Sequence, residues 1–263
     1  MPRRALCLGI NRYATAFRRL RGCVNDARAW AELLRERFAF DEVRVLVDDE
    51  ATREAIRREL GRLARLTQDE DQAAITFSGH GTWSPDEAPL DETDDRDEAW
   101  QAHDGELRDD AMQPLLAAFR PAARVFLISD SCHSGSVARG RRRTAAGGRR
   151  NGRGCLASPR GGRARAGRRP ADPRRALTCD HAPRKGLLLL SGCKDDELSY
   201  EMRRRGVPRG VLSVYAGDFM RAKPDQTWED LINRLRRRLP SVRYPQTPQL
   251  TGDEELMRTP LFS

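Results

Sequence analysis

The stretch "ARVFLISDSCHSG" (residues 123–135) carries a strongly apolar run that ends just before a cysteine, Cys132. A buried structural cysteine is expected inside such a run, whereas Cys132 follows it, where a strand leaves the core for a loop. A second run, "QAAITFSGHG" (residues 72–81), ends in the same way on His80. The sequence therefore raises the question of whether a thiol and an imidazole meet at neighbouring strand ends.

The rest of the chain alternates between strand patterns and helix patterns. Strands are expected at 4–10, 42–48, 72–78, 123–129 and 186–192, and helices at 25–38, 52–66, 110–119, 210–222 and 227–239. This alternation predicts an α/β fold with an open, mostly parallel central sheet and helices on both faces. Ligands of such sheets bind at the carboxyl ends of the strands, and both His80 and Cys132 are expected there.

Length and composition favour one domain over residues 1–263. No stretch approaches the roughly 20 apolar residues that cross a bilayer, and the first apolar run is too short for a signal peptide. Six cysteines without a framework spacing suggest reduced thiols. We therefore expect a cytoplasmic protein without a membrane partner. The excess of Arg over Lys, 45 to 3, indicates a GC-rich bacterial genome.

The net charge of +9 is concentrated in a basic insert at 138–185, which holds 16 Arg and Lys against two Asp. The insert has no Val, Ile or aromatic residue, so it has little to bury and is predicted to be a disordered loop. The remaining residues carry a net charge of −5, which makes nucleic acid an unlikely partner of the folded body. A tether for nucleic acid remains an alternative role of the insert, and its binding would be independent of sequence.

Cys132 and His80 suit nucleophilic catalysis, because an imidazole can accept the proton of a thiol and leave the reactive thiolate. Gly79 and Gly81 flank His80, and Gly135 follows shortly after Cys132. Glycines let backbone N–H groups approach a reacting oxygen. We therefore expect the amides of Cys132 and Gly81 to form an oxyanion hole. His133 is a rival base, but adjacent side chains diverge, so a positioning or solvent-exposed role is expected. A purely structural role for Cys132 and His80 is the alternative.

The motifs "SGHG" (78–81) and "DSCHSG" (130–135) resemble the caspase-fold cysteine peptidases, specifically the metacaspase branch. The separation of 52 positions between His80 and Cys132 fits the caspase arrangement. Further segments resemble other signatures of the family: "LCLGINRY" (6–13), "LRGCVNDA" (20–27), "LLLLSGCKDDELSYE" (187–201) and "YPQTPQL" (244–250). The resemblance implies a caspase-like fold and a cysteine endopeptidase that cleaves proteins or peptides after Arg or Lys.

The resemblance also implies a pocket for the basic side chain, with Asp26 and Asp130 as its carboxylates and Cys23 and Ser78 as smaller lining residues. Two carboxylates can hold a guanidinium through paired hydrogen bonds, which agrees with this assignment. The structural alternatives stay open. Asp26 could be a helix N-terminal acid stabilised by the helix dipole. Asp130 could be a turn residue, and Cys23 a small core residue.

The acidic loop at 86–110 holds twelve Asp and Glu against two Arg. The resemblance implies that this loop binds calcium, an ion that prefers hard oxygen ligands in a flexible loop. The expected ligands are Asp91, Asp94, Asp95, Asp109 and Asp110. Arg139 stands where calcium-dependent members carry a further Asp, so one ligand is replaced by a positive charge. A solvated acidic loop that pairs with the basic insert is the alternative.

The basic insert lies where related peptidases carry their processing sites, so self-cleavage within 139–185 is expected, in cis or in trans. A plain linker is the alternative. Cys155 and Cys179 lack metal-site spacing, so no zinc is expected. Metacaspases are typically monomeric, which implies a monomer. Two other functions remain open: an inactive caspase-like scaffold that binds proteins, and a regulator that binds nucleic acid through the Arg-rich insert.

Overall fold

The computed structural model describes residues 1–14, 17–85, 96–131, 152–153, 185–194 and 197–263. Its centre is a six-stranded sheet with the order β12-β9-β7-β3-β1-β2. The parallel strands are β1 (Arg3–Gly9), β2 (Glu42–Val47), β3 (Gln72–Ser78), β7 (Arg124–Asp130) and β9 (Leu187–Ser191). Strand β12 (Gln249–Gly252) pairs antiparallel with β9. The expected α/β fold with a mostly parallel sheet is confirmed.

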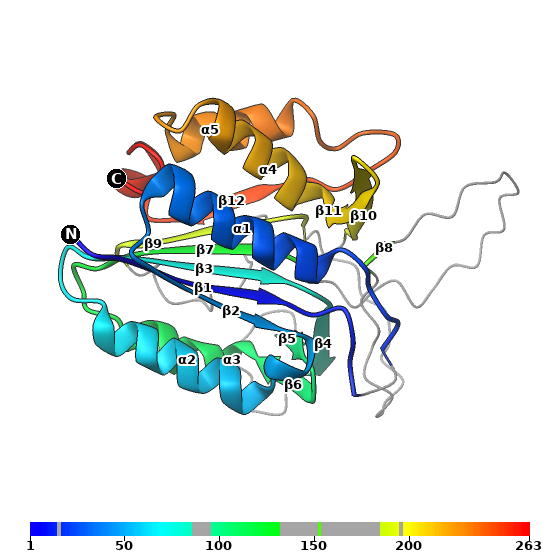
Figure 1. The fold of residues 1–263 in the computed structure, drawn as a ribbon, viewed down its shortest axis with the longest axis horizontal. Helices are drawn as coiled ribbons and strands as arrows, with labels where there is room; N and C mark the ends of the chain where they lie inside the picture. Colours follow the sequence, from blue (N-terminus) through cyan, green and yellow to red (C-terminus); the bar gives the residue numbers. More distant parts are fainter. Residues whose placement is uncertain (15–16, 86–95, 132–151, 154–184, 195–196) are drawn as a thin grey trace, which may run out of the picture.

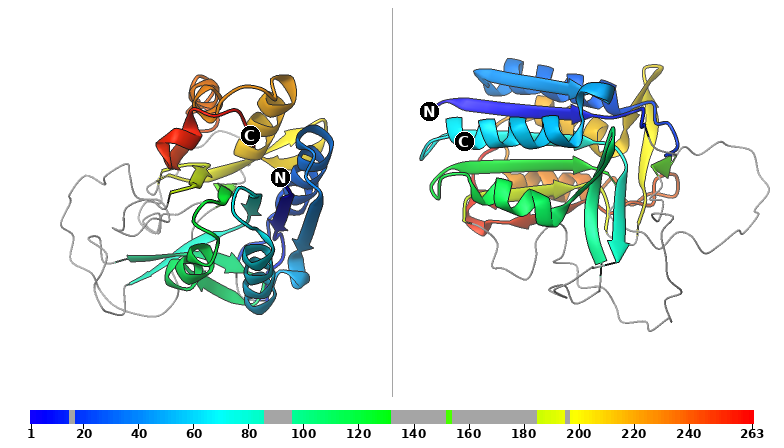
Figure 2. Two further views of the ribbon diagram at one scale, coloured as in Figure 1. Left: turned by 90° about the vertical axis from the view of Figure 1, so that its left-hand side faces the viewer. Right: turned by 90° about the horizontal axis from the view of Figure 1, so that it is seen from below.

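Helices cover both faces of this sheet (Figures 1 and 2). One face carries α1 (Cys23–Phe38), α4 (Val211–Ala222), α5 (Trp228–Arg236) and α6 (Glu254–Met257), and the other carries α2 (Arg53–Leu66) and α3 (Asp109–Ala117). A 3₁₀ turn, η1, spans Asp48–Glu50. Successive side chains of a strand point to opposite faces. On β1, Cys7 therefore packs in the core under α1, while Leu6 and Leu8 pack in the core under α2.

Two small antiparallel sheets extend from the central sheet, and the sequence patterns did not reveal them. One contains β4 (Gly81–Pro85), β5 (Arg96–Ala102) and β6 (Gly105–Arg108), and the other contains β8 (Gly152–Arg153), β10 (Ser199–Arg204) and β11 (Val207–Gly210). The acidic segment 86–110 was expected to be a loop, but β5 and β6 form a hairpin within it. The reason is that Ala99, Trp100 and Leu107 are buried, which the high charge of the segment had hidden. Of the basic insert, only residues 152–153 and 185 are described, so its predicted disorder lies outside the described residues.

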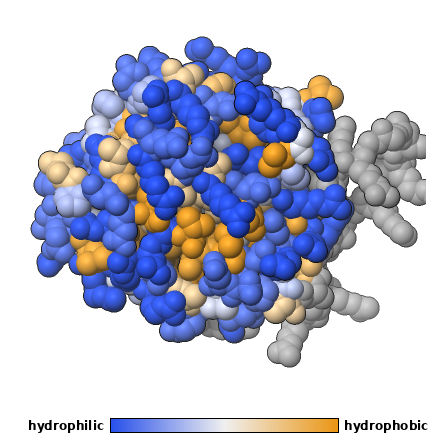
Figure 3. Space-filling view, in the orientation of Figure 1, coloured by the Kyte–Doolittle hydropathy of each residue, from blue (hydrophilic) through white to orange (hydrophobic). Residues whose placement is uncertain are grey.

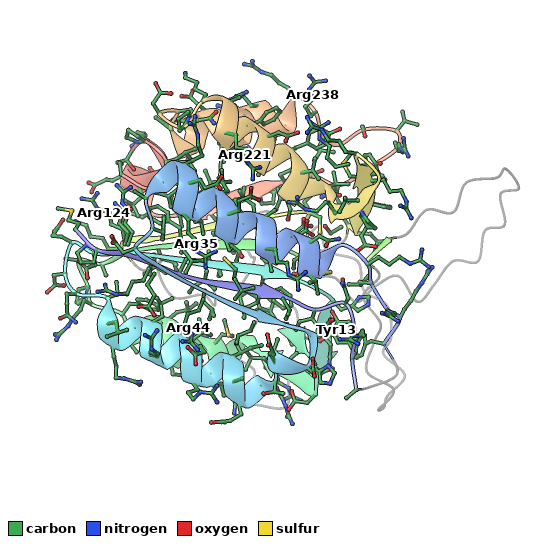
Figure 4. The ribbon with its side chains drawn as sticks, in the orientation of Figure 1. Tyr13, Arg35, Arg44, Arg124, Arg221 and Arg238 are labelled. Carbon is green, nitrogen blue, oxygen red and sulfur yellow. The ribbon has the colours of Figure 1, made fainter. Side chains whose placement is uncertain are left out.

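The parallel strands end at one edge of the sheet in close register. Gly9 is opposite Ser78, and Ser78 is opposite Asp130. Both chain termini lie at the other edge, as the left view of Figure 2 shows. There the carbonyl oxygen of Ser263 accepts a hydrogen bond from Arg124, the first residue of β7. In Figure 4, Tyr13 and Arg124 mark these opposite edges.

The surface in the orientation of Figure 1 is largely polar, with an apolar area over the edge strand β2, between α1 and α2 (Figure 3). Val43, Val45 and Val47 of β2 are partly buried against the core under α1. None of the helices in the described part of the chain is long and apolar enough to cross a membrane.

The Asp253 carboxylate joins the start of α6 to the start of β9. It accepts hydrogen bonds from the backbone N–H groups of Glu255 (2.8 Å), Leu256 (3.2 Å) and Gly186 (2.7 Å). Burial on its own would raise the pKa of Asp253, but these N–H groups and the nearby charge of Lys185 outweigh burial. The pKa of Asp253 is therefore held below its ordinary value.

Asp253→Ala is expected to lower the free energy of unfolding by about 1–2 kcal/mol at neutral pH, because the helix cap and the bond to Gly186 are lost. The folded-state pKa is depressed, so this stabilisation is present above about pH 4 and disappears as the pH falls through the folded value. Urea unfolding across this pH range measures the difference from wild type. Asp253→Asn keeps an acceptor oxygen and should lose less at neutral pH. An equal loss at neutral and strongly acidic pH contradicts the assignment.

Candidate active site

His80 lies between β3 and β4, and its side chain is 1% exposed. Its Nε2 atom is 2.6 Å from the backbone carbonyl oxygen of Arg18. Because a carbonyl oxygen can only accept a hydrogen bond, Nε2 carries the proton of the neutral ring and Nδ1 is the basic nitrogen. The sequence indicated no third residue that would act together with Cys132 and His80. A backbone carbonyl that orients the imidazole has no side-chain signal, so sequence patterns could not have revealed it.

Aromatic rings hold His80 in place. The centroids of the Tyr13 and Phe17 rings lie 5.1 Å and 5.5 Å from that of the imidazole. The Tyr13 hydroxyl accepts a hydrogen bond from the His80 backbone N–H (2.9 Å) and donates one to the carbonyl of Ile10 (2.9 Å). A Cβ at Gly79 would lie 2.8 Å from the Phe77 ring and 3.1 Å from the Tyr13 hydroxyl. Gly79 is therefore needed for this packing.

Cys132 and His133 lie outside the described residues, so the meeting of thiol and imidazole stays a prediction. The described neighbour of Cys132 is Ser131, which is buried at the end of β7. Its hydroxyl is 2.9 Å from that of Ser129, and its carbonyl accepts a hydrogen bond from the Cys193 thiol at 3.5 Å. Strands β3 and β7 are adjacent, so His80 and Cys132 follow neighbouring strand ends, as the sequence had indicated.

Gly81, the other expected contributor to the oxyanion hole, begins β4 directly after His80 and is buried. Its partner in that role, the amide of Cys132, is outside the described residues. The oxyanion hole formed by these two amides therefore stays a prediction.

Asp26 lies in the first turn of α1, and its side chain is fully buried. The carboxylate accepts hydrogen bonds from the Ser78 hydroxyl (2.8 Å) and from the Gly210 N–H (3.0 Å and 2.9 Å to its two oxygens). Arg209 donates through Nε at 2.6 Å and forms a salt bridge with Asp26. Asp26 is thus more than a helix N-terminal acid, because it ties α1 to the end of β3 and to β11.

Asp130 ends β7, and its side chain is 1% exposed. One carboxylate oxygen accepts a hydrogen bond from the Ser199 hydroxyl at 2.7 Å. The other accepts from the backbone N–H (2.9 Å) and the hydroxyl (2.7 Å) of Ser213. Asp130 is a strand residue and not a turn residue. Ser199 stands in the segment 187–201 singled out in the sequence, but its role was not predicted.

The sequence motifs converge on this edge of the sheet. The buried Gln246 side chain donates to the Gly192 carbonyl (2.8 Å) and accepts from the Tyr200 N–H (3.0 Å), which joins the segments 187–201 and 244–250. Cys23 is buried at the start of α1, and its N–H donates to the Asn11 side chain at 2.9 Å. The structure therefore brings Asp26 and Ser78 into contact, sets Asp130 beside Ser78, and buries Cys23 one turn from Asp26.

The described cysteines, Cys7, Cys23 and Cys193, are all buried. Burial raises the pKa of Cys7 to about 12, so its thiol stays protonated at neutral pH and is unsuited to act as a nucleophile.

The calcium prediction falls mostly outside the described residues. Asp91, Asp94 and Asp95 are not described, and for Asp109 and Asp110, which begin α3, only the backbone is. The described residues contain no group of three or more His, Cys, Asp or Glu side chains that could hold a metal ion.

The sheet order and the helices on both faces place the chain in the class of α/β proteins with a caspase-like fold. A crystal structure of a protein from Geobacter sulfurreducens superimposes on the chain with a TM-score of 0.72 and 25% sequence identity. The match covers 100% of this chain and 99% of that one.

Residues 3–139 match the family described as "Metacaspase, peptidase C14 domain". Metacaspase-1 of Emericella nidulans is 29% identical over 97% of this chain and 71% of its own length. Metacaspase-4 of Arabidopsis thaliana is 39% identical over 52% of this chain and 34% of its own length. The chain therefore belongs to the metacaspase family of cysteine peptidases, and the resemblance noted in the sequence is confirmed.

Proposed function

We propose that this metacaspase is an endopeptidase that cleaves after Arg or Lys, with Cys132 as the nucleophile and His80 as the general base. The observation that carries the proposal is the orientation of His80 by the Arg18 carbonyl, at the strand edge that also holds Asp26 and Asp130. The bond to the Arg18 carbonyl fixes the orientation of the buried imidazole, so that proton transfer would take place at Nδ1.

The hydrolysis proceeds in two stages. The Cys132 thiol gives its proton to Nδ1 of His80, and the thiolate attacks the carbonyl carbon of the scissile peptide bond. The amides of Cys132 and Gly81 stabilise the oxyanion. His80 then gives the proton to the leaving amine, and the C–N bond breaks to leave a thioester. A water molecule, deprotonated by His80, hydrolyses the thioester, and the thiol recovers its proton. Throughout, Nε2–H remains bonded to the Arg18 carbonyl, which stabilises the imidazolium.

The preference for Arg or Lys rests on the two buried carboxylates. Asp26 lies on α1 and Asp130 ends β7, and Ser78 stands between them. The Ser78 hydroxyl is bonded to Asp26, and Ser78 is opposite Asp130 in the β3–β7 register. Asp130 accepts hydrogen bonds from the Ser199 hydroxyl and from the hydroxyl and N–H of Ser213, which hold its carboxylate in a defined position. Low-dielectric surroundings strengthen the attraction of such charges for a guanidinium or ammonium group.

Two regulatory features belong to the same proposal. We propose that the enzyme cleaves its own basic insert within 139–185, because the insert offers many Arg residues to an Arg-directed site. Calcium activation would involve Asp91, Asp94, Asp95, Asp109 and Asp110, with Arg139 in place of one expected ligand. We also propose that the enzyme acts as a monomer.

A substrate-library profile of the purified protein tests the proposal. We expect fluorogenic peptides with Arg or Lys before the cut bond to be cleaved at least about 100-fold faster than those with Asp, because a carboxylate-lined site rejects an anion. The profile is recorded after EDTA treatment and again with millimolar calcium, and calcium is expected to raise the rate. Equal rates with and without calcium would remove calcium activation alone. Silence under every condition would favour a scaffold that binds proteins without cleaving them.

A further inference from the structure

We propose that Arg209 is an internal competitor for the pocket carboxylate Asp26 and thereby sets how strongly the enzyme prefers a basic residue before the cut bond. This inference rests on the proposed function, in which Asp26 recognises that basic residue. This role has no recognisable signal in the sequence, because Arg209 lies 183 residues from Asp26 and is one of many arginines.

The contact between Arg209 and Asp26 joins a guanidinium to a carboxylate, as the contact of a substrate Arg side chain with this pocket would. The guanidinium Nε lies 2.6 Å from Oδ1 of Asp26, and the two side chains are 18% and 0% exposed. Arg209 is the penultimate residue of β11, so the chain supplies the same chemical group that the pocket is expected to take from a substrate. A positive charge is therefore already next to Asp26.

The backbone that carries Arg209 is held firmly against the start of α1. Glu201 on β10 accepts a hydrogen bond from the Gly22 N–H at 2.6 Å, and the Asn25 side chain donates to the Pro208 carbonyl at 2.9 Å. A Cβ at Gly22 would lie 3.0 Å from the Cα of Arg209, so the glycine permits this close approach. The hairpin thus delivers Arg209 to Asp26 in a defined position.

A second arginine of the same hairpin forms an ion pair that is much more exposed than the pair between Arg209 and Asp26. Arg204 pairs with Asp218 at 2.7 Å, but the two side chains are 51% and 38% exposed. Exposed pairs of this kind contribute little, because water and salt screen them. The buried pair with Asp26 is much less screened, so a substrate cation must displace Arg209 or share the carboxylate with it. The other pocket acid, Asp130, accepts hydrogen bonds from the hydroxyl groups of Ser199 and Ser213.

Equilibrium binding of p-aminobenzamidine, a fluorescent amidinium probe, tests this competition without turnover. In the Cys132→Ala background, Arg209→Gln removes the charge, and its amide nitrogen reaches only as far as the Nε position that bonds Asp26. It is expected to bind the probe about tenfold more tightly, a difference of about 1.4 kcal/mol. Arg209→Lys keeps the charge and should bind the probe as weakly as the parent. Arg204→Gln, the matched control, should also leave the affinity unchanged. Unchanged or weaker binding by Arg209→Gln, with Lys and Gln behaving alike, overturns the proposal.

Thermal unfolding covers the case in which Arg209→Gln destabilises the fold. The probe should then raise the melting temperature of Arg209→Gln more than that of the parent, because the amidinium replaces the lost guanidinium. An equal rise in both proteins overturns the proposal. The cleavage assay separates this inference from the proposed function. Tighter probe binding without cleavage of Arg or Lys peptides supports Arg209 and removes the peptidase assignment, whereas cleavage without tighter binding does the reverse.

Discussion

Cys132→Ala is expected to abolish hydrolysis of Arg-amide peptides, and His80→Ala to lower kcat/KM by about 1000-fold. The first change removes the atom that attacks the peptide carbonyl. The second removes the group that takes the thiol proton and returns it to the leaving amine. Release of the fluorophore from an Arg-amide substrate measures both losses. Alkylation by iodoacetamide provides a second readout, because Cys132 should react more slowly once His80 is gone.

Matched controls exist for both substitutions. Cys7→Ala changes a buried thiol whose pKa is raised to about 12, and His103→Gln changes a histidine whose ring is bonded to the Arg12 carbonyl. Both variants should retain hydrolysis. If Cys132→Ala retains it as well, the nucleophile is another group and the proposed mechanism is wrong.

The same inactive variant tests self-processing. When wild type and Cys132→Ala are incubated side by side, new fragments with ends inside 139–185 should form in wild type alone. Adding active enzyme to the inactive variant then separates cleavage in trans from cleavage in cis. Fragments that form at equal rates in both samples would point to a contaminating protease.

Asp130→Asn and Asp26→Asn are each expected to lower kcat/KM for Arg and Lys peptides by about 10- to 100-fold, since each removes one charged hydrogen-bond acceptor. Asparagine is nearly isosteric and still accepts from Ser213 or Gly210. In Asp26→Asn the Arg209 guanidinium also loses its charged partner, so this variant is expected to be the less stable of the two. The loss should be in KM more than in kcat, because the pocket binds the side chain next to the cut bond. Initial rates over a range of peptide concentrations measure the split.

Asp218→Asn is the matched control, because Asp218 is paired with an arginine but exposed. It should leave kcat/KM unchanged. Urea unfolding of all three variants identifies the alternative in which Asp26 and Asp130 are purely structural. In that case stability falls while the preference for Arg and Lys over neutral residues is unaltered.

The five parallel strands of the central sheet could be predicted because their signals are local, whereas the antiparallel strand β12 was not predicted. Runs such as 72–78 and 123–129 are apolar throughout, and the helical runs carry apolar residues at regular spacing, so both kinds of element were located within a few residues. The hairpins β5–β6 and β10–β11 were missed because their charged residues dominate short segments. Trp100 and Leu107, which bury the first hairpin, are isolated apolar residues between acidic ones.

The candidate site could likewise be predicted only in part, from its local signals. His80, Asp26 and Asp130 are visible in the sequence because they stand next to recognisable strand ends and motifs. Their partners are not visible. The Arg18 carbonyl is backbone, and Ser199, Ser213 and Arg209 are common residues that reach the site through tertiary packing from far along the chain.

Both chain ends lie at the edge of the sheet opposite His80, with Ser263 bonded to the first residue of β7 and Pro2 bonded to the first residue of β3. An affinity tag, a surface linker or a fluorescent label attached at either end would therefore lie on the side of the molecule away from His80. A molecule immobilised in this way would face the solution with its reactive side, so real-time binding assays on a chip can use the tethered protein.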